Sequence, residues 1–250
     1  SRIQKIQDGA WNLWDEKAAL QVRIPIILKQ RRKKQMSKVI CIAGESGSGK
    51  TTSMRNLDPE TTMYIDCDKK GLSWKGWRNQ YNGEKKNYLK TDFPQVALQA
   101  LKKIDKEEQY KHIRVVVVDT INGLMIADEM RRCKEKGYDK WQDLAQSIYD
   151  LIDYALTMRD DVTIIFVAHT QTDHDDNGYM FTRIKTSGRK LDKITLESKF
   201  STVLLSKCVD GKFLFETQAN FSTAKTPMGA FEEKKIDNDI VQVMKALEEY

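Results

Sequence analysis

Short runs of apolar residues recur along the chain, separated by polar stretches that contain glycine, aspartate or asparagine. These runs cover residues 39–43, 62–65, 115–118 and 162–168, and their length fits strands buried on both faces of a sheet. A further strand is predicted at residues 87–91, followed by a helical spacing of apolar residues over 95–106. The alternation of strands and helices predicts an α/β domain with a mostly parallel central sheet and helices on both faces.

The last fifty residues follow a different pattern. Two strands are predicted on either side of the turn sequence 209–211, Val-Asp-Gly, which is typical of a hairpin at a sheet edge. The stretch 236–250 has the spacing of an amphipathic helix. The apolar residues on its predicted face are Ile236, Ile240, Val243, Met244 and Leu247. We therefore expect a small β-hairpin extension and a helix that serves packing.

Composition places the chain among soluble globular proteins. No apolar run approaches the roughly 18 residues that a membrane helix needs, and the N-terminus lacks an apolar stretch with a small-residue cleavage site. The cysteines are scattered without a CxxC pair, as expected in a reducing compartment. They are Cys41, Cys67, Cys133 and Cys208. We expect one sizeable cytoplasmic domain with no membrane contact.

The net charge of +6 is concentrated in one part of the chain. Residues 1–35 carry nine Lys or Arg against three Asp or Glu, whereas residues 36–250 hold 33 of each. The main part of the chain is therefore not basic as a whole, and any binding of nucleic acid has to come from local loops.

Residues 1–35 also differ from the rest because they resemble translated upstream sequence. Met36 opens "MSKVICIAGESGSGKTT" as a natural start would, and "RRKKQ" just before it is what a purine-rich ribosome-binding site would encode in frame. We expect residues 1–35 to be upstream sequence read through, and 36–250 to be the folded domain. The alternatives are a docking arm, with apolar residues at helical spacing and the edge-strand-like "VRIPIIL", or a surface helix with a basic linker.

The strongest motif is "GESGSGKT", which fits the phosphate-binding pattern G-x-x-x-x-G-K-[ST] between a strand and a helix expected to begin near Lys50. Its glycines let the backbone turn so that N–H groups face the phosphates, and the helix start adds its positive dipole end. Lys50 is expected to reach the β- and γ-phosphates and Thr51 to bind magnesium, which a merely structural turn would not need. The motif predicts a site for ATP, or a similar nucleoside triphosphate, with Mg²⁺. Its residues are Gly44, Glu45, Ser46, Gly47, Ser48, Gly49, Lys50, Thr51 and Thr52.

Acidic residues end two of the predicted strands. The four valines at 115–118 end in Asp119, at the edge where open α/β sheets bind ligands, and an acid there can hold magnesium in the Walker B role. The strand at 62–65 ends in Asp66 and Asp68 and lies between the other two motifs in sequence. RecA-like and AAA-like ATPases have such an additional strand, with a carboxylate that activates water, and simple nucleotide kinases usually lack it.

Three segments resemble the RecA core. "MYIDCDKKGL" is similar to the RecA segment in which an apolar strand runs into Ile-Asp-Ala-Glu, and "VVVVDTINGL" is similar to its Walker B strand. "VTIIFVAHTQ" resembles the later strand that ends in a sensor of the γ-phosphate. Over residues 38–217 the order and spacing resemble compact RecA-core ATPases of bacteriophages, including nucleotide-binding proteins related to the Sak group of single-strand annealing proteins.

The resemblance implies a RecA-like P-loop NTPase core and a role for several residues. Asp68 falls at the position of the family's catalytic glutamate, one methylene shorter, with Asp66 as a competitor. The alternative for Asp68 is a solvated acid that caps the next helix. His169, or Thr170 or Gln171 in its place, would sense the γ-phosphate, unless His169 simply ends its strand. The catalytic residues implied are Lys50, Asp68, Asp119 and His169, with Thr51 and Asp119 as magnesium ligands.

Single-stranded DNA is the partner that the resemblance implies, since RecA-like proteins contact it through loops after the Walker B helix and after the sensor strand. The matching segments, 131–141 and 170–193, carry cations near aromatic residues, which suits backbone tracking with base stacking. Interleaved acids in the first segment favour a solvated helix face instead, and the second would also suit a β-hairpin. The best candidates for DNA contact are Lys185, Arg189, Lys190 and Lys193.

Two lysines, Lys207 and Lys225, lie where relatives place cations that reach a neighbour's γ-phosphate, which implies a homo-oligomer unless both are surface residues. The segment "HTQTDHDD" invites a metal site, but its spacing matches no fixed metal pattern. The sequence thus predicts Mg-dependent ATP hydrolysis coupled to single-stranded DNA handling in phage-type recombination. The alternatives are a nucleotide-switched binding module without a DNA role and a P-loop kinase of small molecules, for which no arginine-rich lid is visible.

Overall fold

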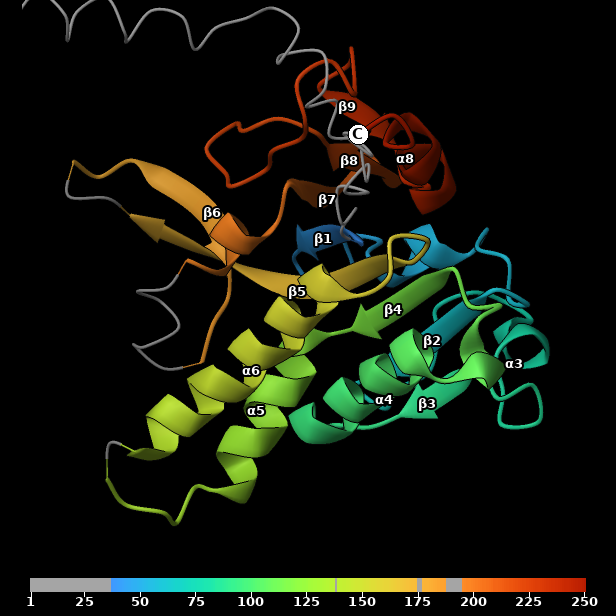
Figure 1. The fold of residues 1–250 in the computed structure, drawn as a ribbon. Helices are drawn as coiled ribbons and strands as arrows, with labels where there is room; N and C mark the ends of the chain where they lie inside the picture. The colour runs from blue at the N-terminus through green and yellow to red at the C-terminus, as the bar shows by residue number, and fades with distance from the viewer. Residues whose placement is uncertain (1–36, 138, 175–176, 188–194) are drawn as a thin grey trace, which may run out of the picture. The chain divides into compact units, whose positions relative to one another are not determined.

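A sheet of nine strands organises the part of the chain that the computed structural model describes, residues 37–137, 139–174, 177–187 and 195–250 (Figure 1). These residues belong to the unit 36–250, and the expectations for residues 1–35 lie outside them. In spatial order the strands are β3 (Tyr88–Lys90), β2 (Thr62–Asp66), β4 (Val115–Asp119), β5 (Thr163–His174), β1 (Lys38–Gly44), β7 (Thr202–Val209), β8 (Lys212–Glu216) and β9 (Lys235–Asp237), with β6 (Met180–Ile184) paired to β5.

Pairing is parallel from β3 to β7 and antiparallel beyond, where β8 and β9 extend one edge and β6 returns along the outer half of β5. The central strands are parallel because apolar, mostly β-branched residues fill both of their faces; every residue of β4 is buried. Strand β5 lies between β1 and β4. The arrangement confirms the expected RecA-like α/β fold with a mostly parallel sheet and a hairpin extension.

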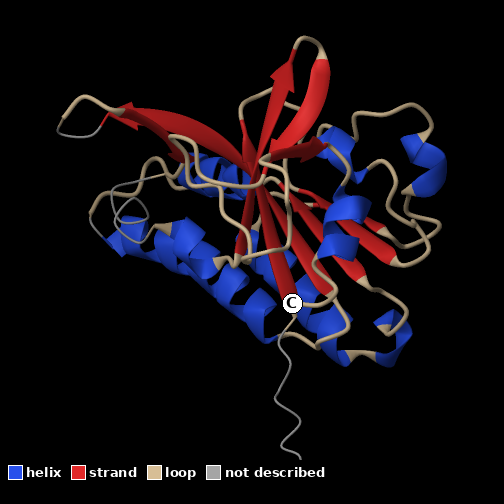
Figure 2. Ribbon diagram, turned by 90° about the horizontal axis from the view of Figure 1, so that it is seen from above, coloured by secondary structure: helices blue, strands red, loops and turns tan. Residues whose placement is uncertain are grey.

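Helices cover both faces of the sheet (Figure 2). One face carries α4 (Pro94–Lys106), α5 (Ile121–Arg131) and α6 (Asp139–Thr157), and the other carries η1 (Thr51–Met54), α3 (Trp77–Gln80) and α8 (Ile240–Ala246). Short 3₁₀ turns, η2 (Glu108–Tyr110) and η3 (Leu196–Lys199), complete the described elements. Among the described residues, none of the helices combines the length and the apolar character that crossing a bilayer requires.

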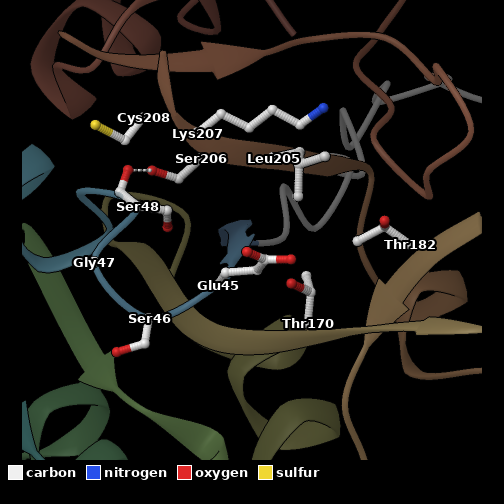
Figure 3. Close-up of a pocket in the computed structure, with 10 residues that line it drawn as sticks. All are labelled: Glu45, Ser46, Gly47, Ser48, Thr170, Thr182, Leu205, Ser206, Lys207 and Cys208. Atoms are coloured by element: carbon white, nitrogen blue, oxygen red, sulfur yellow. Dashed lines mark hydrogen bonds between the residues drawn. The ribbon is translucent and has the colours of Figure 1, made fainter. Parts of the chain in front are cut away.

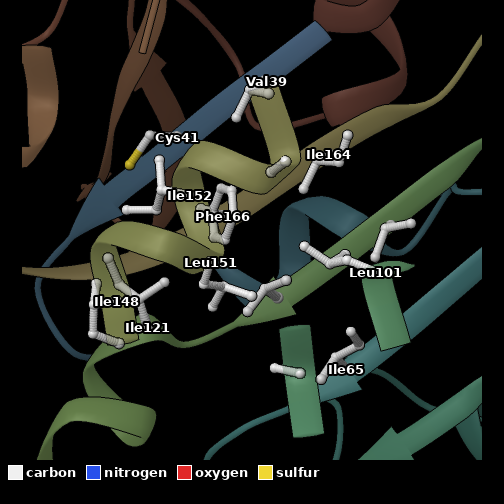
Figure 4. Packing of buried hydrophobic residues seen from close by; sticks show 14 of the residues in the cluster. Val39, Cys41, Ile65, Leu101, Ile121, Ile148, Leu151, Ile152, Ile164 and Phe166 are labelled. Carbon is white, nitrogen blue, oxygen red and sulfur yellow. The ribbon is translucent and has the colours of Figure 1, made fainter. Parts of the chain in front are cut away.

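The alternation of side chains along β1 divides the core into two layers. Val39, Cys41 and Ala43 face the layer under α4, α5 and α6, whereas Ile40 and Ile42 face the layer under α3 and α8. Phe166 lies in the first layer, fully buried against α6, with its ring centroid 5.8 Å from that of Phe200 (Figure 4). Both layers fix the strands, and so they fix the edge at which the predicted motifs end.

Two helices are shorter than the sequence predicted. The helix expected to begin near Lys50 is only the four-residue 3₁₀ turn η1, because Ser53 Oγ bonds back to the Lys50 carbonyl oxygen at 2.6 Å and Pro59 follows soon after. Its dipole is therefore short. The closing helix begins at Ile240, because Ile236 lies in β9 instead.

Substitution of Phe166 tests the packing of the first core layer. Replacing it with alanine removes a fully buried ring, so Phe166→Ala should lower the free energy of unfolding by about 3–5 kcal/mol. Phe221, which is 71% exposed, is the matched control, and Phe221→Ala should change it by less than about 0.5 kcal/mol. Urea denaturation measures both. Equal losses in the two variants would contradict the packing described here.

Candidate functional site

The loop after β1 turns sharply because two of its glycines leave no room for a side chain. A Cβ on Gly44 would lie 2.5 Å from Ser48 Oγ and 2.6 Å from the carbonyl oxygen of Ser206. Gly49 has a φ of +94°, and the ring of Phe213 lies 2.6 Å from where its Cβ would be. Since only glycine fits at both positions, the loop can fold back and gather successive N–H groups toward one point, as phosphate-binding loops do.

Strand β7 braces this loop from outside. Ser206 Oγ donates to the carbonyl oxygen of Ser48 at 2.7 Å, and Asn238 Nδ2 donates to Ser206 Oγ at 3.2 Å. A cavity of about 270 Å³ lies beside the loop, between β7 and Thr170 and Thr182 of the β5–β6 hairpin (Figure 3). Ser48 Oγ is buried and has no hydrogen-bond partner within the described part of the chain. The loop is therefore rigidly held while it keeps an unused polar atom.

Lys50 is buried inside the loop. Its Nζ donates to the carbonyl oxygens of Gly44 at 2.9 Å and of Glu45 at 2.5 Å. Burial lowers the pKa of Lys50 to about 8, although the nearby charge of Asp119 acts against this shift. Among the described residues the buried ammonium is held by carbonyl oxygens alone, and it gains stability from an anion, so this lysine suits a phosphate group.

Asp119, at the end of β4, is held by two hydroxyl groups. Its Oδ2 accepts hydrogen bonds from Thr51 Oγ1 at 2.8 Å and from Tyr64 Oη at 2.6 Å. Its Oδ1 is buried and has no donor among the described residues, and burial raises the pKa of the carboxyl group. A buried oxygen without a donor is a group that a cation satisfies, and hydroxyl and carboxylate oxygens are what Mg²⁺ prefers. Thr51 and Asp119 therefore fit the predicted magnesium site.

Asp66 lies beside Asp119 in register, at the end of the neighbouring strand β2. It is buried, and its Oδ2 accepts hydrogen bonds from the backbone N–H of Gly71 at 2.8 Å and from Tyr88 Oη at 2.6 Å. These contacts close the turn after β2. The carboxyl group of Asp66 is thus engaged in local structure.

Asp68 makes different contacts. Its Oδ1 accepts a hydrogen bond from Thr120 Oγ1 at 2.9 Å, and its Oδ2 lies 2.6 Å from Lys70 Nζ. Its side chain is 17% exposed, and a Cβ on Gly123 would lie 2.3 Å from Oδ1. Asp68 therefore lies against the start of α5, close to Asp119, with access to solvent. These contacts favour Asp68 over Asp66 as the acid that meets a substrate.

His169 lies on β5, level with Gly44 on β1. Its backbone N–H donates to Asn122 Oδ1 at 2.7 Å, while Asn122 Nδ2 donates to the Lys185 carbonyl oxygen at 2.7 Å. The Lys185 N–H in turn donates to the His169 carbonyl oxygen at 2.8 Å. Burial, and then the charge of Lys50, lower the pKa of His169. A neutral imidazole next to the loop is compatible with the predicted sensor role, which stays a prediction.

The loop after β1, the three acids and His169 lie within the part of the chain that matches a known protein family. A family model described as an AAA domain matches residues 36–225, from the strand before the loop to beyond β7 and β8. The chain belongs to this AAA-domain family. It is a P-loop ATPase, a class of protein that binds and hydrolyses nucleoside triphosphates, and ATP with Mg²⁺ is the general ligand of such domains.

This AAA-domain chain is similar to a solved structure, that of the flagellar accessory protein FlaH from Methanocaldococcus jannaschii. The two are 15% identical, the alignment covers 81% of this chain and 84% of that chain, and the TM-score is 0.40. No curated protein matches the chain.

Of the two lysines expected to act on a neighbour, Lys207 is paired through its side chain and Lys225 is held through its backbone. Lys207 Nζ lies 3.0 Å from Oε2 of the buried Glu216, across the β7–β8 hairpin. Lys225 pairs its backbone with Val203 of β7, with N–O distances of 2.8 and 2.9 Å. A role for either lysine in a neighbouring site, and a homo-oligomer, stay predictions.

The first segment expected to contact DNA, 131–141, connects α5 to α6 in this ATPase. Arg131 lies 3.2 Å from Asp92, and Arg132 lies 3.0 Å from Asp143. Both arginines are therefore paired with acids. This pairing favours the solvated-helix interpretation over DNA contact for the first segment.

In the second segment, 170–193, the described residues 170–174 of β5 pair with 180–184 of β6, which is the β-hairpin that the sequence allowed as an alternative. Arg183 pairs with Asp173 across the hairpin, and Lys185 is exposed. Arg189, Lys190 and Lys193 lie outside the described residues, as do Asp175 and Asp176 of the metal alternative. No group of three or more His, Cys, Asp or Glu that could hold a metal ion occurs in the described part of the chain.

Sequence reasoning missed three residues at this ATPase site. Tyr64 is an aromatic residue within a strand, and nothing in its neighbours signals a hydrogen bond to Asp119. Asn122 is a polar residue among the apolar residues that begin α5, and a polar residue in that position is a signal that could have been used. Lys70 stands in a run of charges where any one could be merely solvated.

Asp119→Asn should weaken the contribution of magnesium to ATP affinity and leave the contribution of the phosphate contacts unchanged. The amide keeps the shape but loses the charge that would hold magnesium, so affinity for a fluorescent ATP analogue in Mg²⁺ should fall by more than about 10-fold. In EDTA the variant and the unaltered protein should bind alike. Lys50→Ala, by contrast, should lose affinity with and without Mg²⁺. Overlapping magnesium titrations for Asp119→Asn and the unaltered protein would rule Asp119 out as a ligand.

Proposed function

We propose that this AAA-domain chain is a magnesium-dependent ATPase that couples ATP hydrolysis to the handling of single-stranded DNA. The observation that carries the ATPase part is the meeting of Thr51 with Asp119, whose second oxygen has no donor among the described residues, directly after buried Lys50. The N–H groups of residues 44–52 and Lys50 would hold the phosphates, and Thr51 and Asp119 would hold magnesium. Magnesium, when bound, would neutralise charge on the phosphates.

Asp68 is the residue that we assign to activate the attacking water. Its partial exposure and its hydrogen bond from Thr120, next to Asp119, support this role, because a general base has to reach both solvent and the reacting phosphate. Asp66 is buried and closes a turn, which argues against it.

His169 is the residue that we assign to sense the γ-phosphate. Its place on β5 beside Gly44 supports the assignment, and its lowered pKa favours a neutral imidazole that can donate or accept one hydrogen bond. The strand continues beyond His169 into the β5–β6 hairpin. A change at the phosphate would therefore have a short covalent path to the hairpin.

Single-stranded DNA is the partner that we propose for the basic segment that follows this hairpin in the sequence. The support is the resemblance to RecA-like proteins, together with the cations Lys185, Arg189, Lys190 and Lys193 after the sensor strand. Phosphate contacts by lysine and arginine supply most affinity for nucleic acid regardless of sequence.

A nucleotide-switched binding module without DNA is the second candidate function. Two observations favour it: residues 36–250 carry no net charge, and both Arg131 and Arg132 are paired with acids. It shares the ATP site with the first proposal and differs only in the partner.

Asp68→Asn should spare ATP binding and slow hydrolysis, because the amide keeps the contact with Thr120 but accepts no proton. We expect kcat to fall by about 100-fold, with affinity for an ATP analogue within about two-fold of the unaltered protein. Phosphate release and analogue titration measure the two quantities. Asp66→Asn serves as the comparison: if it slows hydrolysis in a folded protein while Asp68→Asn does not, the two acids exchange roles.

The DNA proposal is tested by neutralising three cations together, Lys185→Ala, Arg189→Ala and Lys190→Ala. Oligonucleotide affinity with ATP should weaken for all sequences, and the slope of log affinity against log salt should shrink by about 2, or 0.7 for each lost phosphate contact. The basic residues at 1–35 are present in both proteins, so the difference isolates the segment. The matched control replaces Lys134 and Lys136 in the first segment and should change little. If the unaltered protein shows no ATP-dependent binding at low salt, the switched module becomes the better account.

A further inference from the structure

The turn after β2 carries three consecutive charges, Asp68, Lys69 and Lys70, on an unusual backbone. Lys69 has a φ of +58°, a left-handed conformation that costs a residue with a side chain roughly 1–2 kcal/mol. Gly71 follows with a φ of +83°, and its N–H is fixed by Asp66 Oδ2. Backbone strain that the surroundings hold in place is concentrated at functional sites. This turn therefore has the strained backbone that is typical of functional sites.

This backbone directs the two lysines to different acids. Lys69 Nζ lies 2.6 Å from Asp92 Oδ2, at the approach to α4. Lys70 Nζ lies 2.6 Å from Asp68 Oδ2. The side chains are similarly exposed, at 48% and 52%. The two neighbouring lysines are thus similarly exposed and each is paired with an acid, but the acids differ.

The acid that Lys70 meets belongs to the ATP site. Asp68 accepts a hydrogen bond on its other oxygen from Thr120, which directly follows Asp119. Two side-chain contacts therefore connect the Lys70 ammonium to the Walker B segment. Because only about half of the Lys70 side chain is covered, its four-carbon stem can swing without disturbing the core.

Electrostatics also places Lys70 on the phosphate side of the turn. Burial is the main cause of the lowered pKa of Lys50 and of His169, and the charge of Lys70 adds to both shifts. The same charge opposes the burial that raises the pKa of Asp119. For Lys70 itself, partial burial is outweighed by the hydrogen bond to Asp68 and by the charge of Asp119, so its pKa is raised and it is cationic at neutral pH.

We propose that Lys70 is a catalytic residue whose ammonium moves from Asp68 to the γ-phosphate of ATP, supplying a second cation from the same chain. The inference rests on the ATPase function proposed above. Water attacks the γ-phosphorus as the bond from that phosphorus to the bridging oxygen breaks, the water proton passes to Asp68, and ADP and inorganic phosphate leave. Lys50 and Lys70 then stabilise the negative charge from two sides. The move also frees the Asp68 oxygen that accepts the proton.

The proposal gives this site a cation that does not depend on a neighbour. Lys207, one of the lysines considered for action on a neighbouring subunit, is bonded to the buried Glu216. Moving it would leave that carboxylate buried without its partner, which is unfavourable. Lys70 leaves only Asp68, whose role in the reaction requires a free oxygen.

Lys70→Ala, with Lys69→Ala as the matched control, tests the proposal in the full chain. We expect kcat of Lys70→Ala, from phosphate release with Mg-ATP, to fall by about 100-fold or more, while affinity for a non-hydrolysable ATP analogue stays within about three-fold. Lys70→Arg should retain most of the activity because it keeps the cation. Lys69→Ala should stay within about two-fold. Equal kcat values for Lys70→Ala and Lys69→Ala would overturn the proposal.

A double variant separates direct contact from the positioning of Asp68. If Lys70 only holds Asp68, then adding Lys70→Ala to Asp68→Asn will change nothing, and the proposal fails; direct contact with phosphate predicts a further fall in kcat. Melting temperatures verify folding, and Lys70→Gln replaces Lys70→Ala if the latter is unstable. Absence of phosphate release by the unaltered protein would overturn the ATPase function itself, whereas normal release by both it and Lys70→Ala would overturn only the role of Lys70.

Discussion

The hydrogen bond between Thr51 and Asp119 joins the loop that follows β1 to the end of β4, a strand that is not a neighbour of β1 in the sheet. Strand β5 lies between β1 and β4, so the 2.8 Å bond forms only if the ends of three parallel strands are level. Their register is fixed because both faces of each strand are buried, and a slip of one residue would turn apolar side chains to the wrong layer. The two core layers therefore determine where the loop lysine, the hydroxyl and the acid meet.

The five residues that begin with Asp119 position the other groups of the site. Thr120 fixes one oxygen of Asp68, and the absence of a side chain at Gly123 gives that oxygen its room. Asn122, one turn away, holds the backbone of His169. A single short segment therefore connects the acid at the end of β4 to Asp68 after β2 and to His169 on β5. Substitutions there should disturb several functions at once, since each contact shares the same backbone.

The sequence was sufficient for elements whose signal is local. Four valines before Asp119 predicted a central strand, the glycine-lysine-threonine pattern predicted the loop, and Asp210 with Gly211 predicted the hairpin turn, where both have positive φ values of 50° and 76°. The length of the helix after the loop could not be predicted, because it depends on how Ser53 bonds back to the backbone. Nor could the partners of Asn122, which lie 47 and 63 residues away. Such contacts depend on tertiary structure, which periodicity does not report.

Strand β5 changes its neighbour at the point where it passes the ATP site. Up to Val167 it pairs with β4, and from Thr170 onward it pairs with β6. Between these two stretches, the side chain of Asn122 makes hydrogen bonds of the kind that a neighbouring strand would make. Its oxygen accepts from the His169 N–H, and its nitrogen donates to the Lys185 carbonyl oxygen. If His169 shifted against a phosphate, it would either carry Lys185 with it or break one of these part-buried hydrogen bonds, at a cost of about 1 kcal/mol. Three hydrogen bonds thus join His169, Asn122 and Lys185, and His169 also lies level with Gly44 in the parallel β1–β5 pair. A shift of His169 would therefore be felt both at the phosphate-binding loop and at the base of the β5–β6 hairpin.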